Sequence, residues 1–354
     1  MNRPVTIVQI AKECGVSIAT VSRVMNGTAP VSEATRAKVN EAIQRHRYTP
    51  NAFARSLIKR QSMTVGVIMP DITNPYFSAM FSQFEHAARR ANYSVLLCNT
   101  SFSAGEAEER TQRELDYFQM MLDKNVDGVI VAGGQADLLT VSDTYRNALQ
   151  HLSSHLPVVV LGNQIPGVDC RFIQRERGQG VFSAVNYLAS LGHRNIAFVG
   201  GEQGVGITSA RLEAFQDALV TLGLPHRPDS VMLSDYYTPD GYRATKALLA
   251  GNVPFTAMLT MNDSVAQGAY RALADSGLRV PQDVSVISCD QFWSADFLVP
   301  RLTSVDQHNE LFGRFIIHTL LGAIHGVKED VVLAYQPELV IRESCAPPAP
   351  ASRW

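Results

Sequence analysis

The sequence has few cysteines, and their spacing suggests no pairing. Cys14, Cys98, Cys170, Cys289 and Cys345 are odd in number and far apart, and no two of them form a CxxC pair. A disulfide framework and a structural zinc site are therefore not expected, and this cysteine usage favours a reducing compartment. Cys14, Cys98 and Cys289 lie in apolar segments, so we expect them to be small core residues.

Long hydrophobic runs are also missing. No apolar stretch approaches the roughly 20 residues that a membrane-spanning helix needs. The first residues, MNRPVTIVQIAKECG, lack the apolar stretch of a secretory signal. We therefore expect a cytoplasmic protein that makes no contact with a membrane.

The motifs of common enzyme classes are absent as well. The chain contains no GxSxG, no Walker-type loop, no HExxH and no Cys–His nucleophile context. The glycine-rich segment GGEQGVGITSAR (200–211) follows an apolar run, but it fits GxGxxG poorly and no acidic ribose contact follows it. This disfavours a dehydrogenase, and no catalytic residue, cofactor or bound metal is expected.

Charge is present but unevenly distributed. Residues 1–60 hold ten basic and three acidic side chains, a formal charge of +7, whereas the remaining residues hold 21 and 30, a charge of −9. A small basic head on a large acidic body is typical of a module that binds a polyanion. From charge alone, a basic face that is merely solvated is an equal alternative.

The head predicts three short helices. Thr6 caps a helix that runs to about Cys14, and Gly15 permits the backbone to turn. Ser17 caps a second helix, IATVSRVMN, and Ser32 opens a third, EATRAKVNEAIQRH. A helix, a four-residue turn and a second helix form a helix-turn-helix unit. The side chains of the third helix expected to face inward are Ala34, Val39, Ala42 and Ile43.

A separate short segment follows the head. Tyr48-Thr49-Pro50-Asn51 interrupts the pattern, and AFARSLIKR (52–60) is basic with an apolar side formed by Phe53 and Leu57. This segment is too short to be a stable helix in isolation. We expect it to fold only when something else holds it.

From Met63 onward, apolar strands alternate with amphipathic helices. The expected strands are 64–70, 94–100, 128–133, 157–162, 195–201, 230–234, 256–263 and 283–290, and the expected helices are 75–91, 105–123, 137–152, 178–191, 207–222, 239–250 and 264–276. Continuous apolar strands separated by helices predict parallel sheets covered on both faces. The number of strands favours two doubly wound subdomains. The Pro/Ala-rich residues 346–354 are expected to be disordered.

Polar and aromatic residues gather at the predicted strand ends. Doubly wound sheets bind ligands at the carboxyl ends of their strands, and in a two-lobed protein those ends face a shared cleft. Planar amide, carboxylate and guanidinium groups suit paired sugar hydroxyls, and aromatic faces suit sugar C–H surfaces. Core packing is the alternative for Tyr76, Phe77 and Phe102, and a helix cap is favoured for Asp263. The set that suits a sugar is Asn74, Tyr76, Phe77, Arg211, Asn262 and Asp290.

Several segments together carry a family resemblance. VTIVQIAKECGVSIATVSRVMNG, VSEATRAKVNEAI, YTPNAFARSL, VGVIMPDITNPYF, LGHRNIAFVGG and VPQDVSVISCD resemble the lac/galactose repressor family. The resemblance covers nearly the whole chain and implies a dimeric, operator-binding transcriptional regulator with a sugar effector. It implies an all-α helix-turn-helix head (1–48), a hinge helix (49–61) and a periplasmic-binding-protein-like α/β body (62–345). The implied subdomains are about 62–163 with 308–326, and about 164–304 with 327–345.

The same resemblance assigns residues to the two sites. In the family, the second head helix enters the major groove, and the hinge helix inserts a leucine, here Leu57, into the minor groove. Ile18 and Ala19 can touch thymine methyls but cannot hydrogen-bond a base. The DNA-binding residues implied are Thr6, Ser17, Ile18, Ala19, Thr20, Ser22, Arg23, Asn26, Tyr48, Asn51, Ala54, Arg55 and Leu57. The effector-binding residues implied are Asp71, Asn74, Tyr76, Phe77, Arg211, Asn262, Asp290 and Gln307.

Some positions depart from the family pattern. Gln174-Arg175-Glu176-Arg177, Gly162-Asn163 and Ser288-Cys289 replace segments that differ in many relatives, and Gln291-Phe292-Trp293 adds an aromatic near the expected cleft. These departures leave the effector's identity open. A regulator with a purine or nucleoside corepressor, a periplasmic binding protein, and an architectural DNA binder without a ligand are the alternatives.

Overall fold

The structure is a computed structural model that describes residues 5–26, 30–46, 48, 61–100, 107–175, 178–327 and 335–349. The chain forms two compact units, Met1–Ser62 and Met63–Trp354. We call them the head and the body and describe each by itself.

The head contains the three predicted helices, α1 (Ile7–Cys14), α2 (Ile18–Asn26) and α3 (Glu33–Arg45). Thr6 begins α1 with a capping box, in which its side chain accepts from the Gln9 amide and the Gln9 side chain accepts from the Thr6 amide. Gly15 ends the helix at φ 65°, a left-handed conformation that glycine adopts without steric cost.

A small apolar core joins these helices. Its buried members are Ile10, Ala11, Cys14, Val21, Val39 and Ala42. The inward face of α3 agrees with the prediction at Val39 and Ala42, and Ile43 packs beside them. Ala34, in the first turn of α3, was expected to face inward but is exposed.

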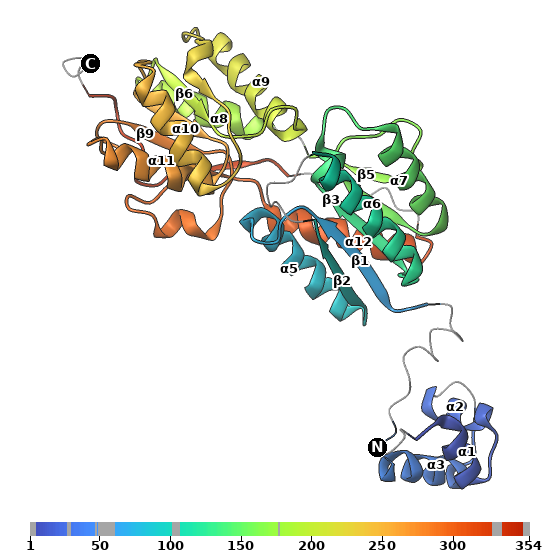
Figure 1. Ribbon diagram of the computed structural model, residues 1–354. Helices are drawn as coiled ribbons and strands as arrows, with labels where there is room; N and C mark the ends of the chain where they lie inside the picture. The colour runs from blue at the N-terminus through green and yellow to red at the C-terminus, as the bar shows by residue number, and fades with distance from the viewer. Residues whose placement is uncertain are drawn as a thin grey trace. The chain divides into compact units, whose positions relative to one another are not determined.

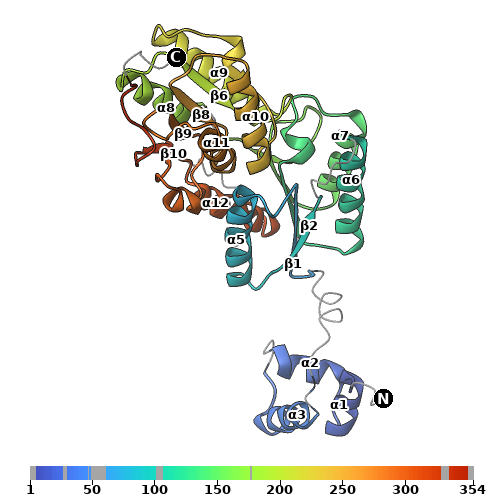
Figure 2. The ribbon, with the colours of Figure 1, turned by 60° about the vertical axis from the view of Figure 1, so that its left-hand side comes forward.

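The body consists of two lobes, each built on one mainly parallel sheet (Figures 1 and 2). The sheet of lobe 1 has the order β2-β1-β3-β4-β5, and all its strands are parallel. Its strands are β1 (Thr64–Met69), β2 (Ser94–Asn99), β3 (Gly128–Ala132), β4 (Val158–Leu161) and β5 (Arg171–Ile173). Its helices are α5 (Pro75–Arg90), α6 (Ala107–Asp123), η1 (Gly134–Asp137), α7 (Asp143–His155) and α12 (Asn309–Ile324).

Lobe 1 has a separate apolar core on each face of its sheet. Val65, Val67 and Met69 pack on the side of α5 and α12, whereas Ile68 packs on the side of α6 and α7. Successive residues of a strand point to opposite faces, and both faces here are covered (Figure 1). This explains why the strands are apolar without interruption.

The sheet of lobe 2 has the order β11-β10-β9-β8-β6-β7, and only β11 runs antiparallel to its neighbour. Its strands are β6 (Ile196–Val199), β7 (Val231–Met232), β8 (Ala257–Thr260), β9 (Ser285–Ser288), β10 (Thr303–Asp306) and β11 (Glu338–Val340). The helices are α8 (Gln179–Ser190), α9 (Gly206–Thr221), η2 (Pro228–Ser230), α10 (Thr238–Ala250), α11 (Asp263–Asp275) and η3 (Trp293–Phe297).

Three boundaries differ from the sequence prediction. The first lobe was expected to end near residue 163, but β5 pairs with β4, so the chain crosses to lobe 2 only after Ile173. The helix expected at 137–152 is divided into η1 and α7. Residues 346–349 were expected to be disordered, yet His193 Nε2 lies 2.9 Å from the Ala346 carbonyl oxygen, and the Ala346 amide donates to Ser285 Oγ.

Within the described residues, no helix combines the length and the apolar character needed to cross a membrane.

Candidate functional sites

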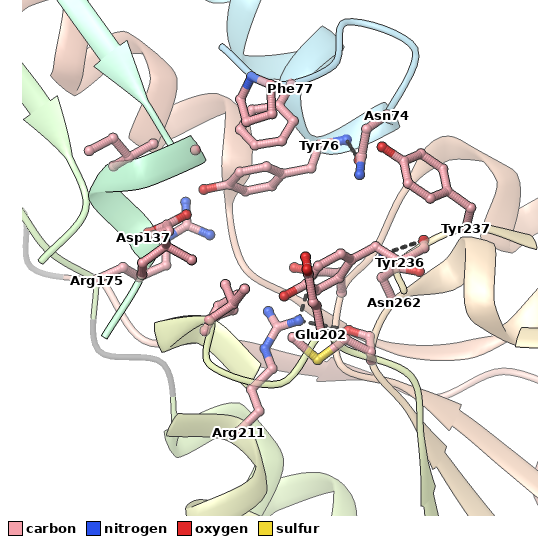
Figure 3. Close-up of a pocket in the computed structure, with 18 of the residues that line it drawn as sticks. Asn74, Tyr76, Phe77, Asp137, Arg175, Glu202, Arg211, Tyr236, Tyr237 and Asn262 are labelled. Carbon is pink, nitrogen blue, oxygen red and sulfur yellow. Dashed lines mark hydrogen bonds and ion pairs between the residues drawn. The ribbon is translucent and has the colours of Figure 1, made fainter. Parts of the chain in front are cut away.

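A cavity of about 350 Å³ lies between the two lobes of the body, at the carboxyl ends of their strands (Figure 3). Small-molecule sites occupy roughly 300–1,000 Å³, so this cavity suits a small ligand. Seven of the eight predicted effector-binding residues line it: Asn74, Tyr76, Phe77, Arg211, Asn262, Asp290 and Gln307.

A buried ion pair forms one wall of the cavity. Arg211 Nη1 donates to Asp290 Oδ2 at 2.8 Å and to the Met261 carbonyl oxygen at 2.7 Å. Burial alone would lower the pKa of Arg211, but the neighbouring carboxylate reverses this effect and holds the guanidinium charged. Arg211 Nε and Asp290 Oδ1 are buried without a hydrogen-bond partner. The pair therefore offers one donor and one acceptor to a molecule in the cavity.

The aromatic residues come from the start of α5. The Asn74 side chain accepts from the Tyr76 amide at 3.0 Å and so caps the helix. The rings of Tyr76 and Phe77 lie edge to face with centroids 5.1 Å apart. Both rings line the cavity (Figure 3), so the core-packing alternative does not fully account for them. Phe102 lies outside the described residues.

Asn262, not Asp263, caps the helix that follows β8. Asn262 Oδ1 accepts from the Val265 amide at 2.9 Å, and its Nδ2 donates to the Tyr236 carbonyl oxygen. The predicted cap at Asp263 is therefore wrong by one residue. Asp263 instead accepts from the Phe292 amide at 2.7 Å, and burial raises its pKa to about 7.

Asp71 is the predicted effector residue that does not line the cavity. Its Oδ1 accepts from the Thr73 amide, which closes a local turn after β1. Its Oδ2 accepts from the Tyr237 hydroxyl of lobe 2 at 2.8 Å. Asp71 thus joins the two lobes beside the cavity.

Gln307 occupies the crossing from lobe 2 back to lobe 1. Its Nε2 donates to the Cys289 carbonyl oxygen at 3.0 Å, while its Oε1 is buried without a partner. The side chain is only 1% exposed. Gln307 therefore presents a buried acceptor in the lining of the cavity.

Sequence reasoning missed much of the lining that comes from helices and loops. Glu114 carried a usable signal, because it lies on the same face of α6 as Phe118 and Met121, which are buried. Its Oε1 accepts from the Gln135 amide, and burial raises its pKa to about 7. The charged and aromatic lining residues that were not predicted are Arg110, Glu114, Asp137, Arg175, Glu202, Tyr236, Tyr237 and Phe312. Phe292 lines the cavity, where the sequence indicated an additional aromatic residue.

Further contacts join the lobes at the rim of the cavity. The Leu139 amide donates to the Gly204 carbonyl oxygen at 3.0 Å, next to a bridge between Leu138 and Val205. Arg110 of α6 lies 3.8 Å from Glu202 of lobe 2. With the Tyr237–Asp71 hydrogen bond, these contacts hold the lobes together around the cavity.

The outer side of α2 is the second candidate site. Ser17 Oγ accepts from the Thr20 amide and begins the helix. Ser17, Ile18, Ala19 and Arg23 are exposed, and Thr20 and Ser22 are partly so. This surface can face a partner, as the sequence predicted.

Other residues predicted to bind DNA either take part in the structure of the head or lie outside the described residues. The Thr6 side chain is exposed but takes part in the cap of α1. Tyr48 packs against the core of the head, so part of its ring serves stability. Asn26 ends α2. Asn51, Ala54, Arg55 and Leu57 lie outside the described residues.

Two family models match the chain. One, for bacterial regulatory proteins of the lacI family, covers residues 6–51, and one for a periplasmic binding protein-like domain covers residues 185–345. The HTH-type transcriptional repressor PurR of Pasteurella multocida is 33% identical over 340 residues, which are 96% of this chain and 98% of that protein. Catabolite control protein A of Priestia megaterium is 36% identical over 309 residues, or 86% and 87%.

Solved structures agree with these matches. The lac repressor dimer bound to operator and the anti-inducer ONPF has a TM-score of 0.83 and 27% identity, covering 97% of this chain and all (100%) of that one. A complex of the transcriptional regulator CelR with cellobiose has a TM-score of 0.68 and 28% identity, with the same coverage. A helix-turn-helix head with a two-lobed, periplasmic-binding-protein-like body defines a DNA-binding transcriptional regulator. The chain belongs to the lacI family, as its sequence motifs indicated.

Proposed function

We propose that this regulator is a homodimeric repressor of a carbohydrate-utilisation operon, and that a sugar in the cavity of the body controls its binding to a palindromic operator. The observation that carries the sugar assignment is the Arg211–Asp290 pair, which leaves a buried donor and a buried acceptor unpartnered beside the rings of Tyr76 and Phe77. Adjacent hydroxyls of a sugar satisfy such a donor and acceptor together, and its C–H faces pack on aromatic rings.

The matched structures support this assignment. CelR was solved with cellobiose, and a related regulator from Enterococcus faecium, 28% identical with a TM-score of 0.67, was solved with ribose. In the head, the exposed side of α2 supplies the major-groove contacts, and the hinge residue Leu57 supplies the minor-groove wedge. The lac repressor structure is a dimer on operator, and we propose the same assembly here.

A purine corepressor is the second candidate. The PurR relatives favour it, and the rings of Tyr76, Phe77 and Phe292 could stack on a base. The edge of a purine also presents a donor beside an acceptor, so we favour a sugar on the sugar-bound structures of CelR and the Enterococcus faecium regulator. Titration with neutral monosaccharides and with purine bases separates the two.

The decisive experiment titrates the full chain with such ligands by calorimetry and compares Asp290→Asn with the wild type. Loss of a hydrogen bond to a charged group costs about 1.5–3 kcal/mol, so we expect roughly 10- to 100-fold weaker sugar binding. The affinity for a palindromic duplex selected by the wild type should stay the same without ligand, and the ligand should no longer change it. Asp229→Asn, on the exposed helix η2, is the matched control. Unchanged sugar affinity in Asp290→Asn would contradict the proposal.

A further inference from the structure

Arg175 lies at the first crossing between the lobes and lines the cavity (Figure 3). Its Nη1 donates to the Asn309 side chain at 2.6 Å, at the start of α12. The guanidinium carbon lies 4.0 Å from the centre of the Phe312 ring and 5.9 Å from that of Tyr335. These contacts fix the plane of the guanidinium and hold it between the crossing segment and α12.

The other edge of the guanidinium has no protein partner. Arg175 Nε and Nη2 are both buried without a hydrogen bond, and no carboxylate among the described residues forms an ion pair with Arg175. Nε–H and the adjacent Nη2–H point in parallel, which is the geometry that binds two oxygens of one carboxylate or phosphate.

Among the described residues, no carboxylate that lines the cavity forms an ion pair with Arg175, although Asp137 lies near it in Figure 3. Arg211 pairs with Asp290, and Arg110 pairs with Glu202. Glu114 bonds to the Gln135 amide. Arg175 is therefore a cation in the lining of the cavity, and its guanidinium contacts one amide and two rings among the described residues. Buried donor groups of a cation that have no hydrogen-bond partner destabilise the protein, and an anion that enters the cavity and accepts from them removes this cost.

We propose that the sugar bound in this cavity is anionic, a sugar acid or a sugar phosphate, and that its anionic group binds the Nε and Nη2 edge of Arg175 while its hydroxyls bind Arg211 and Asp290. This inference rests on the proposed function and specifies its ligand class. The two groups then recognise different parts of the ligand: the Arg211–Asp290 pair binds its hydroxyls, and Arg175 binds its anionic group. The departure of Gln174-Arg175 from many relatives becomes a determinant of specificity.

The test uses the full chain and a matched ligand panel. The panel contains glucose, galactose and mannose, each with its uronic acid, its aldonic acid and its 6-phosphate. Calorimetry measures each Kd for the wild type, Arg175→Met, Arg175→Lys and the control Arg194→Met, which removes an exposed arginine of lobe 2. The melting temperature of each free variant shows whether it folds.

We expect an acid or a phosphate to bind best, and which of the two binds identifies the source of the anion. Arg175→Met should weaken that ligand about 10- to 100-fold and its neutral hexose less than about threefold. Arg175→Lys should restore part of the loss, because it keeps the charge without the paired donors. Arg194→Met should change neither.

Three outcomes would overturn the inference, and they differ in whether the sugar proposal also fails. If neutral hexoses bind more tightly than their acids and phosphates, or if Arg175→Met binds the anionic ligand as the wild type does, the inference fails while the sugar proposal stands. If no member of the panel binds, both fail.

Discussion

Glu114 is a carboxyl group that the body holds almost completely away from water. Only 3% of the residue is exposed, and burial raises its pKa from 4.5 to about 7. Because the folded state binds this proton more tightly than the unfolded state, the group imposes no penalty below pH 4.5. The penalty grows as the pH rises from 4.5 to about 7, so the free energy of unfolding falls over that range.

We therefore expect Glu114→Gln to stabilise the chain more at pH 8 than at pH 5. The difference in unfolding free energy between variant and wild type should grow by up to about 3 kcal/mol across that range. Urea denaturation of both proteins at several pH values measures it. The glutamine keeps an acceptor for the Gln135 amide, so the variant and the wild type both retain this hydrogen bond. Glu108→Gln, at an exposed position of the same helix, is the control. If the difference in unfolding free energy between Glu114→Gln and the wild type did not change with pH, the argument would be refuted.

Individual residues also show where sequence patterns stop being informative. Arg211 and Asp290 were expected to converge from separate strand–helix junctions, and their 2.8 Å contact confirms that geometry. Asn262 and Asp263 are adjacent and both suit a cap, so only the backbone conformation decides between them. Arg175 follows the last strand of lobe 1, and nothing in the local pattern indicates that it faces the cavity.

At the scale of elements, most strands and helices between residues 64 and 290 were predictable because their signals are continuous. β1, β3 and β4 are apolar along their whole length, since both faces of their sheet are covered. The sequence pattern missed β5, β10, β11 and α12. The three strands are short and each includes a charged residue, so none forms a continuous apolar run. The range of α12 was expected only as part of a subdomain that the family resemblance implied. The site needed more than strand ends, because α6 brings residues that no strand-based argument places there.

The contacts between the lobes yield a prediction about element motion. The Tyr237 hydroxyl donates across the lobes to Asp71, whereas the Tyr242 hydroxyl donates to Asp275 within lobe 2. Tyr237→Phe should therefore favour lobe opening and weaken ligand binding about tenfold, in line with one hydrogen bond to a charged group.

Small-angle scattering of the ligand-free chain, together with calorimetric ligand affinity, measures this effect. Tyr242→Phe is the matched control, because it also removes a tyrosine–aspartate hydrogen bond but one that joins no lobes. Equal effects of the two variants would mean that the Tyr237 contact does not hold the lobes closed.

For the whole molecule, the decisive property is the separation of charge. Residues 1–60 carry +7 and the remaining residues −9. Each phosphate that a basic side chain neutralises releases counter-ions, so salt must weaken DNA binding. With six to ten phosphate contacts per dimer, affinity for random duplex should fall by about 10³–10⁵ between 50 and 200 mM salt.

Fluorescence anisotropy with the full chain measures this slope. Replacing the exposed pair Arg36 and Lys38 by glutamine should make it shallower, whereas Lys124→Gln in the body should leave it unchanged. A response to salt that is flat, or that the head variant does not alter, would show that the basic head does not bind the phosphate backbone.

The position of α12 has a consequence for how the chain is made. This helix covers lobe 1, packing against α5 and β3, yet it follows every strand of lobe 2 except β11 in the sequence. Proteins fold from the N-terminus as they leave the ribosome. Lobe 1 therefore emerges with one apolar face of its sheet incompletely covered and stays so until all of lobe 2 but its last strand has been synthesised. Apolar surface that is exposed during synthesis is prone to aggregation, so we expect lobe 1 to be at risk of aggregation during this interval.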